Sequence, residues 1–141
     1  GAVTDDLSAL AELASQQYVS LKTFKRDGSS VATPVWITAD NDAVCIITQA
    51  DSGKVKRIRN NDTVELAPCD MRGTVSGPYL PGRAELLDEQ GTRHVQDLIR
   101  EKYTAMALFM RVYRGMDRAA RRLLRRSRPD TQIGIRVRTA V

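Results

Sequence analysis

The chain has 141 residues, of which 42% are hydrophobic and 28% are charged. This is an ordinary globular balance, so it gives no reason to expect a disordered or fibrous protein. No stretch approaches the eighteen apolar residues of a membrane span, and the first helical pattern carries acids where a secretion signal needs a basic start. We therefore expect one domain over residues 1–141, in the cytoplasm.

The net charge of +5 is distributed unevenly along the chain. Residues 93–128 hold eleven Arg and Lys against three Asp and Glu, which leaves the rest of the chain slightly acidic. A basic segment favours a polyanionic partner, such as a phosphate, a nucleic acid, an acidic lipid or a carboxylate-rich cofactor. Charge alone does not choose among these partners.

The first part of the sequence predicts a helix and then several β-strands. Apolar residues at helical spacing, from Leu7 to Ala14, predict a short opening helix. Strand patterns follow at residues 18–24, 31–38 and 43–48, and turn residues at 26–29 make the first two strands a hairpin. Pro34 has no N–H, so its strand should lie at a sheet edge or a bulge.

The rest of the sequence predicts two more helices and the remaining strands. A short helix over residues 54–60 should bury Val55 and Ile58, and a long helical region covers residues 88–126, with a break near Gly115. Further strand patterns cover residues 63–66, 74–79, 82–87 and 132–138.

Six or seven short antiparallel strands favour a small closed β-barrel with flanking helices, because closure removes exposed strand edges. So small a barrel has little room inside, so a ligand would lie on its outer wall or between two copies. The strands carry more apolar surface than one barrel interior can use. We therefore expect a homodimer.

The most specific local motif is Ser52-Gly53-Lys54, which stands between a predicted strand and a predicted helix. Exposed N–H groups at a helix start attract phosphate, Gly53 permits a close backbone approach, and Ser52 adds a hydroxyl. The helix carries four cations and no acid, namely Lys54, Lys56, Arg57 and Arg59. Lys54 and Arg57 can converge on one phosphate because they lie three residues apart. A solvated basic helix without a ligand is the alternative.

No set of residues typical of nucleophilic or metal catalysis is present. His94 is the only histidine, and Cys45 and Cys69 have no activating partner nearby in the sequence. We expect both cysteines to be reduced and buried, and His94 to lie at the surface or at a partner contact. An enzyme of this kind would depend on a bound cofactor for its reactivity.

Three segments, in order and at suitable spacing, resemble the pyridoxamine-phosphate-oxidase-like class of flavin and deazaflavin reductases. They are Thr33-Pro34-Val35-Trp36, residues 48–61 and residues 64–73. The closest similarity is to the actinobacterial branch that uses coenzyme F420. It extends over nearly the whole chain, including Glu101-Lys102-Tyr103 and the closing strand at residues 133–137.

The resemblance implies a split β-barrel homodimer with two cofactor sites at the subunit interface. The Ser52-Gly53-Lys54 loop and Arg57 would hold the cofactor phosphate, on the same residues as the phosphate argument above. Further implied contacts are Thr33, Val35 and Trp36 at the flavin-like ring, Thr48 near the ring or ribityl chain, and Pro68 to Asp70 close to the interface. Trp36 could instead be the one large aromatic residue of the core.

The two candidate cofactors differ in charge, since F420 carries a poly-γ-glutamate tail beyond its phosphate and FMN ends at the phosphate. Lys56 and Arg59 could receive such a tail, together with an arginine stripe at helical spacing: Arg111, Arg114, Arg118, Arg122 and Arg125. The stripe could also be a solvated helix face or a contact to a partner or nucleic acid.

We therefore predict an oxidoreductase that transfers a hydride between reduced F420 and an electron-poor double bond or imine of a small organic substrate. No residue stands out as a general acid, so the compensating proton would come from water. The alternatives are an FMN-dependent oxidase or reductase on the same fold, and a non-catalytic flavin or F420 carrier. A nucleic-acid-binding barrel is disfavoured because only seven residues are aromatic and no strand combines stacking and basic residues.

Overall fold

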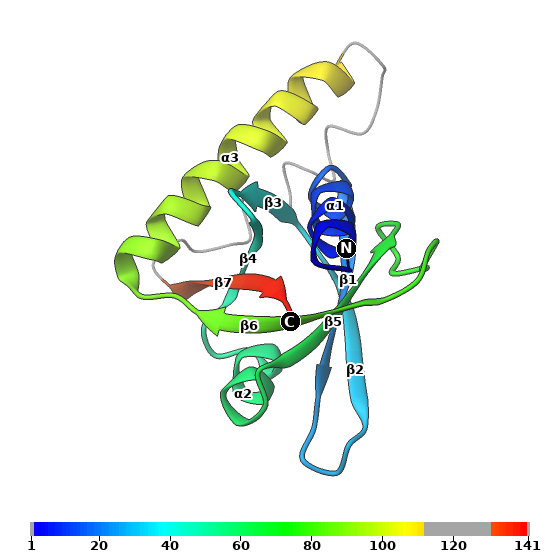
Figure 1. Ribbon diagram of the computed structural model, residues 1–141. Helices are drawn as coiled ribbons and strands as arrows, with labels where there is room; N and C mark the ends of the chain where they lie inside the picture. The colour runs from blue at the N-terminus through cyan, green and yellow to red at the C-terminus, as the bar shows by residue number, and fades with distance from the viewer. Residues whose placement is uncertain (1, 112–130, 141) are drawn as a thin grey trace.

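The computed structural model describes residues 2–111 and 131–140, which form seven strands and three helices. The strands are β1 (Tyr18–Phe24), β2 (Ser30–Val35), β3 (Ile37–Asp40), β4 (Ala43–Gln49), β5 (Thr63–Cys69), β6 (Leu80–Leu86) and β7 (Gln132–Thr139). The helices are α1 (Ala2–Ala14), α2 (Gly53–Asn60) and α3 (Glu89–Arg111) (Figure 1). None of the described helices is long and apolar enough to cross a membrane.

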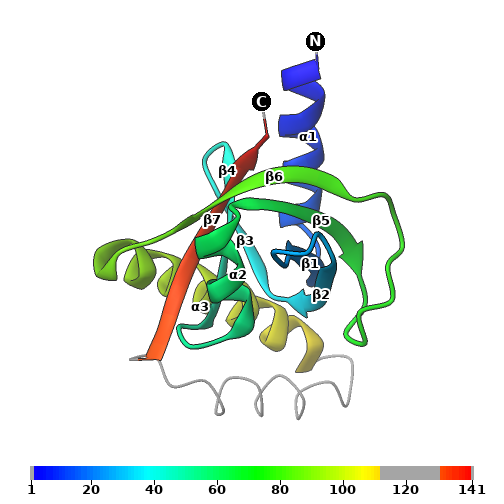
Figure 2. The same ribbon diagram turned by 90° about the horizontal axis from the view of Figure 1, so that it is seen from below.

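All seven strands belong to one antiparallel sheet in the order β2-β1-β5-β6-β7-β4-β3. The two edge strands, β2 and β3, are consecutive in the chain and meet at Trp36. The sheet therefore curls back on itself as a split β-barrel, and its curl is visible in Figure 2. The mainly-β fold with flanking helices that the sequence predicts is confirmed.

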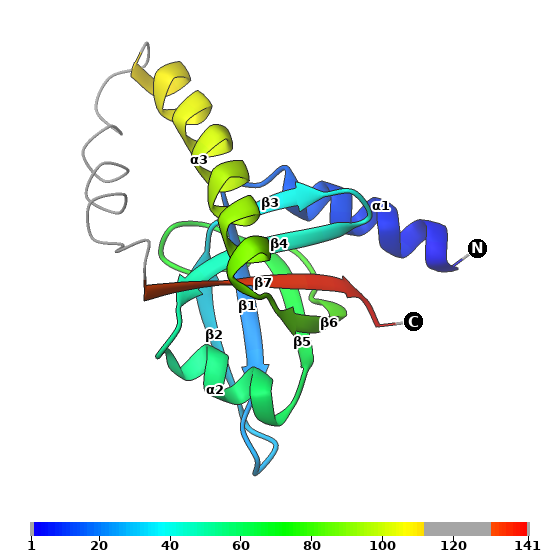
Figure 3. The same ribbon diagram turned by 90° about the vertical axis from the view of Figure 1, so that its left-hand side faces the viewer.

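The main hydrophobic core fills the inside of the curled sheet. Alternate residues of each strand point into it, as strand geometry requires; examples are Val19, Leu21, Val44, Ile46, Val64, Leu66, Ile135 and Val137. Leu10 and Leu13 of α1 join this core, as does Ile58 of α2. The two helices pack on it from separate sides (Figure 3).

A second core lies between α3 and the outer face of the sheet. Val95, Ile99 and Tyr103 of α3 pack against Cys45 of β4, with Trp36 partly buried beside them. The odd-numbered residues of β4 face α3, and its even-numbered residues face the barrel interior. This strand is therefore buried on both sides. This explains the uninterrupted apolar sequence that predicts a central strand.

Two neighbouring side chains of α3, Lys102 and Tyr103, connect three separate parts of the chain; we call them the junction pair. The Lys102 ammonium donates to the carbonyl oxygens of Ala14, Gln16 and Ile37 at 2.7, 2.8 and 2.6 Å. Burial lowers the pKa of Lys102 to about 8, while the three carbonyls match the three N–H donors of the charged form. The junction pair thus holds the start of β1 and the start of β3 against α3.

The strand predicted over residues 31–38 is interrupted at Trp36, and this corrects the sequence-based boundaries. Val35 lies in the barrel core, whereas Trp36 packs in the second core. The N–H of Ile37 donates to the Tyr103 hydroxyl at 2.9 Å. The chain therefore leaves one strand and begins the next at the point where α3 contacts it.

The end of β5 and the segment after it also differ from the prediction. β5 continues to Cys69 through Pro68, because the Pro68 carbonyl faces away from β1 and accepts from Ser76 N at 2.9 Å. The absent N–H of Pro68 would face the same way, so no hydrogen bond to β1 is lost. Residues 74–79 form no strand and make only one isolated bridge, between Cys69 and Val75.

Pro34 lies on the edge strand β2, as its missing N–H predicts. The long helix is described as far as Arg111, and the rest of the predicted helical region, with Gly115, lies outside the described residues.

Candidate functional site

The Ser52-Gly53-Lys54 motif lies where the sequence predicts, between the end of β4 and the start of α2. Ser52 is the N-cap residue, with an extended backbone at φ −71° and ψ 158°. Its side chain makes no capping hydrogen bond, and its Oγ is buried without a hydrogen-bond partner. The helix therefore begins with free N–H groups and a free hydroxyl beside them.

Arg57 folds back over this loop from the next turn of α2. Its Nε donates to Thr23 Oγ1 at 2.6 Å, and Thr23 is fully buried on β1. A Cβ added to Gly53 would lie 2.7 Å from Arg57 Nη1. A side chain at position 53 would therefore displace the guanidinium, which the hydrogen bond to Thr23 of the first strand holds against the loop.

The charge of the loop is uncompensated by the described parts of the chain. Neither Lys54 nor Arg57 forms an ion pair with a described carboxylate. Burial, and secondly the nearby Arg57, lower the pKa of Lys54. Two cations, free helix N–H groups and a free hydroxyl together form an environment that favours an anion.

A second buried hydroxyl without a partner belongs to Thr33 on β2. Among the described side chains, which are those of residues 7–106 and 131–140, Thr33 Oγ1 and Ser52 Oγ are the two buried oxygens or nitrogens that lack a hydrogen bond. β2 contacts β4, the strand that carries Thr48 and leads to Ser52. A buried hydroxyl usually has a partner, so each of these two atoms has hydrogen-bonding capacity left for a polar group.

Val35 and Trp36 follow Thr33 but lie in different cores. Val35 is 8% exposed and packs inside the barrel, on the same face of β2 as Thr33. The Trp36 indole stacks on Tyr103 with ring centroids 4.1 Å apart and an interplanar angle of 11°. Its packing in the second core agrees with a structural role, and its incomplete burial leaves part of the indole accessible.

Pro68 and Asp70 are not brought to the phosphate loop within one chain. On β1, Val19 pairs with Pro68, four residues away from Thr23, which contacts Arg57. At the rise of a strand, the four residues from Val19 to Thr23 span roughly 13 Å along β1. The Asp70 carboxylate is exposed and accepts from the N–H groups of Thr74 and Arg72, both at 2.9 Å, and these bonds lower its pKa.

The cysteines and the histidine form no reactive group. Cys45 and Cys69 are free thiols, and burial raises the pKa of Cys45 to about 11. Cys69 is only partly buried, less than the sequence predicts. His94 is exposed, as expected, with Nε2 3.5 Å from Asp40 Oδ1. Among the described residues, no group of three or more His, Cys, Asp or Glu could hold a metal.

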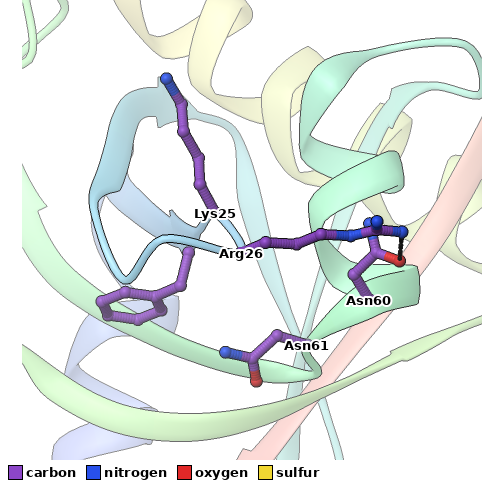
Figure 4. Close-up of a pocket in the computed structure, with 5 residues that line it drawn as sticks. Lys25, Arg26, Asn60 and Asn61 are labelled. Carbon is purple, nitrogen blue, oxygen red and sulfur yellow. Dashed lines mark hydrogen bonds between the residues drawn. The ribbon is translucent and has the colours of Figure 1, made fainter.

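Sequence reasoning did not find a hollow at the other end of α2 (Figure 4). The hollow, of about 290 Å³, is lined by Phe24, Lys25, Arg26, Asn60 and Asn61. Arg26 Nη2 donates to Asn60 Oδ1 at 3.2 Å. The eight residues of α2 separate the hollow from Ser52 by roughly 12 Å, so it is distinct from the Ser52-Gly53-Lys54 loop. The fold brings together the two segments that line the hollow, since Arg26 and Asn60 lie 34 residues apart in the sequence.

A sequence profile of the pyridoxamine 5'-phosphate oxidase family matches residues 7–129, which is most of the chain. The chain belongs to this family. Membership assigns it to flavin-related oxidoreductases, in agreement with the resemblance of its three motifs. No curated protein matches the sequence.

Solved structures of the same fold cover nearly all of the chain. A putative pyridoxamine 5'-phosphate oxidase from Listeria innocua is 16% identical, with 96% of this chain and 94% of that chain covered and a TM-score of 0.61. An F420 reductase is 17% identical, with 92% of both chains covered and a TM-score of 0.56. An FAD-binding protein from Mesorhizobium loti is 12% identical, with 96% and 87% covered and a TM-score of 0.58. At these identities the likeness establishes the fold.

The free hydroxyl of Thr33 leads to a testable contrast with Thr23. Thr33→Val should leave the free energy of unfolding unchanged or raise it by up to about 1 kcal/mol, because the substitution removes a buried hydroxyl that has no partner. Thr23→Val should lower it by about 1–2 kcal/mol, because it removes the acceptor of Arg57 Nε. Urea unfolding of both variants measures this. Equal losses would show that Thr33 has a partner in the free protein.

Proposed function

We propose that the protein is a cytoplasmic F420-dependent oxidoreductase that transfers a hydride between the reduced deazaflavin and a small organic substrate. One observation carries the proposal. Two buried hydroxyls without partners, Thr33 Oγ1 and Ser52 Oγ, occur together with the unpaired cations Lys54 and Arg57 in a member of a flavin-related oxidoreductase family.

The residues present fit the phosphate of such a cofactor. The Ser52 hydroxyl can donate to a phosphate oxygen, the N–H groups at the start of α2 can donate beside it, and Lys54 and Arg57 supply charge. Gly53 leaves the space in which the Arg57 guanidinium lies beside the loop. The ring and ribityl chain would then contact Thr33, Val35, Trp36 and Thr48.

The bound cofactor would supply the hydride chemistry, and the chain would supply binding, orientation and shielding from water. Arg57 is suited to orientation because Thr23 fixes its side chain before any ligand arrives. The apolar residues around Val35 and Trp36 would keep water from the transfer path. The described residues include no group suited to act as a general acid at this site, so the proton would come from water.

We also propose that the working form is a homodimer and that each site is completed by the second copy. Pro68 and Asp70 lie far from the phosphate loop of their own chain, and a second chain could bring them to it. The segment beside them exposes apolar side chains, with Met71 53% and Val75 38% exposed. Apolar side chains exposed next to the proposed interface residues support a contact between copies.

The choice of F420 over FMN rests on cations that a single phosphate does not need. Lys56 and Arg59 are exposed on α2 and have no described acidic partner. A poly-γ-glutamate tail would give them one. The arginine stripe lies outside the described residues except for Arg111, the last residue of α3. An FMN enzyme, or a non-catalytic carrier, would use the same loop without the tail contacts.

Lys54→Ala should weaken cofactor binding by about 1.5–3 kcal/mol, because it removes a charge-assisted contact to phosphate. Titration with F420, followed by quenching of cofactor fluorescence, measures the affinity. Lys56→Ala is the matched control, since it removes the same charge from an exposed position on the same helix. It should weaken cofactor binding by less than Lys54→Ala does. An unchanged affinity in Lys54→Ala would exclude the loop as the phosphate site.

The lowered pKa of Lys54 adds a pH criterion to the same experiment. A bound phosphate favours the charged lysine and raises its pKa, so binding above the pKa of the free protein requires uptake of a proton. Affinity should therefore fall as pH rises through the pKa that Lys54 has in the free protein. Lys54→Ala should lose this dependence, and its persistence would assign the proton to another group.

F420 should bind at least tenfold more tightly than FMN, a difference of about 1.4 kcal/mol. The F420 affinity should rise with the number of glutamates and fall between roughly 50 and 500 mM salt, because exposed attractions are screened. Replacing both Lys56 and Arg59 by Glu should reduce the dependence on tail length more than it changes binding of a tail-less deazaflavin phosphate. Equal affinities for the two cofactors, with no effect of tail or salt, would favour the FMN enzyme.

Sedimentation at micromolar concentration should give about twice the chain mass of 15.7 kDa. Met71→Glu together with Val75→Glu should shift the protein toward the monomer, because two charges would be buried in the contact. The same variant should lose cofactor affinity if the second chain completes the site. A monomer that binds cofactor as tightly as the unmodified protein would contradict an intersubunit site.

A further inference from the structure

Tyr103 of α3 holds both the side chain and the backbone at the break between β2 and β3. Its ring stacks on the Trp36 indole at a centroid separation of 4.1 Å. Its hydroxyl accepts from Ile37 N at 2.9 Å and donates to Gln17 O at 2.6 Å. The indole and the peptide that follows it are therefore both fixed by one residue of another element.

The neighbouring lysine holds the next peptide, which contains the carbonyl of Ile37. The Ile37 carbonyl accepts from Lys102 Nζ at 2.6 Å, so both backbone polar groups of Ile37 bond to α3 side chains. Trp36 is thus followed by a residue whose position is determined by α3 rather than by strand pairing alone. Few degrees of freedom remain for the indole.

The stacked Trp36 follows directly in the chain after the β2 residues to which the proposed function assigns the cofactor ring. Thr33 and Val35 end β2 directly before Trp36, and the partnerless Thr33 hydroxyl lies two residues before Val35. Tyr103 itself is 4% exposed and its hydroxyl is occupied, so it offers no surface to a ligand. Any effect of Tyr103 on binding must pass through the residues that it holds.

We propose that Tyr103 is a positioning residue for the cofactor ring and acts through Trp36. The inference rests on the proposed function, because it requires that the ring lies against the partly exposed indole. A side chain that is already fixed in the free protein loses little conformational freedom when a ligand binds. The stack therefore pre-forms one wall of the ring site.

The only tryptophan of the chain is Trp36, so its emission reports directly on the stack. Tyr103→Phe keeps the ring and removes the hydroxyl, while Tyr103→Leu removes both. Ile99→Ala is the control for lost stability, because Ile99 packs in the same core from the same helix. Emission maximum, quenching of Trp36 by acrylamide, urea unfolding, and affinity for F420 and FMN are measured for all three variants.

Tyr103→Phe should keep the native emission and bind cofactor within about threefold of the unmodified protein. Tyr103→Leu should shift the emission, increase acrylamide quenching and weaken binding by about tenfold. The Ile99→Ala variant should bind cofactor within about twofold of the unmodified protein, even if it is destabilised as much as Tyr103→Leu. If Ile99→Ala weakens binding as much as Tyr103→Leu, the effect is one of stability and the positioning role is wrong.

A double-mutant cycle with Trp36→Leu tests whether Tyr103 acts through the indole. In the Trp36→Leu background, Tyr103→Leu should weaken binding by less than about twofold. A full tenfold loss there would mean that Tyr103 acts by another route and would overturn the proposal. Should Tyr103→Leu fail to fold, Tyr103→Met replaces it, because a thioether fills similar volume without stacking a ring.

The same data separate this inference from the proposed function. If the unmodified protein binds neither F420 nor FMN, the proposed function fails and the positioning role fails with it. If it binds cofactor but the affinity is indifferent to Tyr103→Leu, only the positioning role is overturned.

Discussion

The arrangement of the chain depends on the cation that Lys102 contributes to three converging carbonyls. The oxygens of Ala14, Gln16 and Ile37 come from the end of α1, from the residue pair before β1, and from the first residue of β3. Three carbonyl dipoles that point at one spot repel one another unless a donor lies between them. The ammonium therefore stabilises the meeting of α1, β1 and β3 beside α3.

Polar groups are hydrogen-bonded at the junction of β2 and β3, but some remain without partners elsewhere on β2 and at the start of α2. At this junction, the polar groups are used by the junction pair, and Ile37 has both backbone groups bonded. By contrast, Thr33 on β2 and Ser52 at the start of α2 keep buried hydroxyls without partners, and Lys54 and Arg57 of α2 have no described carboxylate partner. The fully bonded junction therefore supplies stability, whereas the free hydroxyls and cations leave hydrogen-bonding and charge capacity for the anion proposed above.

Much of this could be predicted from local pattern, and the rest required contacts between distant residues. Alternating residues identified most strands, and the uninterrupted apolar run identified β4, since each pattern is contained in a few neighbouring positions. The Ser52-Gly53-Lys54 loop was found for the same reason. The break at Trp36 was missed because its cause is Tyr103, 66 residues from Ile37 in the sequence. The strand over residues 63–66 extends further than its pattern predicts, because Pro68 turns its missing donor away from β1. Thr23, which fixes Arg57, shows no signal in the sequence beyond its place in a strand.

The edge position of Pro34 bears on how copies of this protein can associate. At the hairpin end, Lys25 N donates to Ser29 O, so these two residues form a hydrogen-bonded pair. Hydrogen-bonded and non-hydrogen-bonded pairs alternate along β1 and β2. By this alternation, Ser20 and Pro34 form a pair that exchanges no hydrogen bonds. Pro34 therefore points its nitrogen toward the open side of β2, where an added strand would need a donor. A β-strand of another chain that pairs with this edge would therefore lack one N–H donor at Pro34. Growth of the sheet from chain to chain is thereby discouraged, and association is left to side chains.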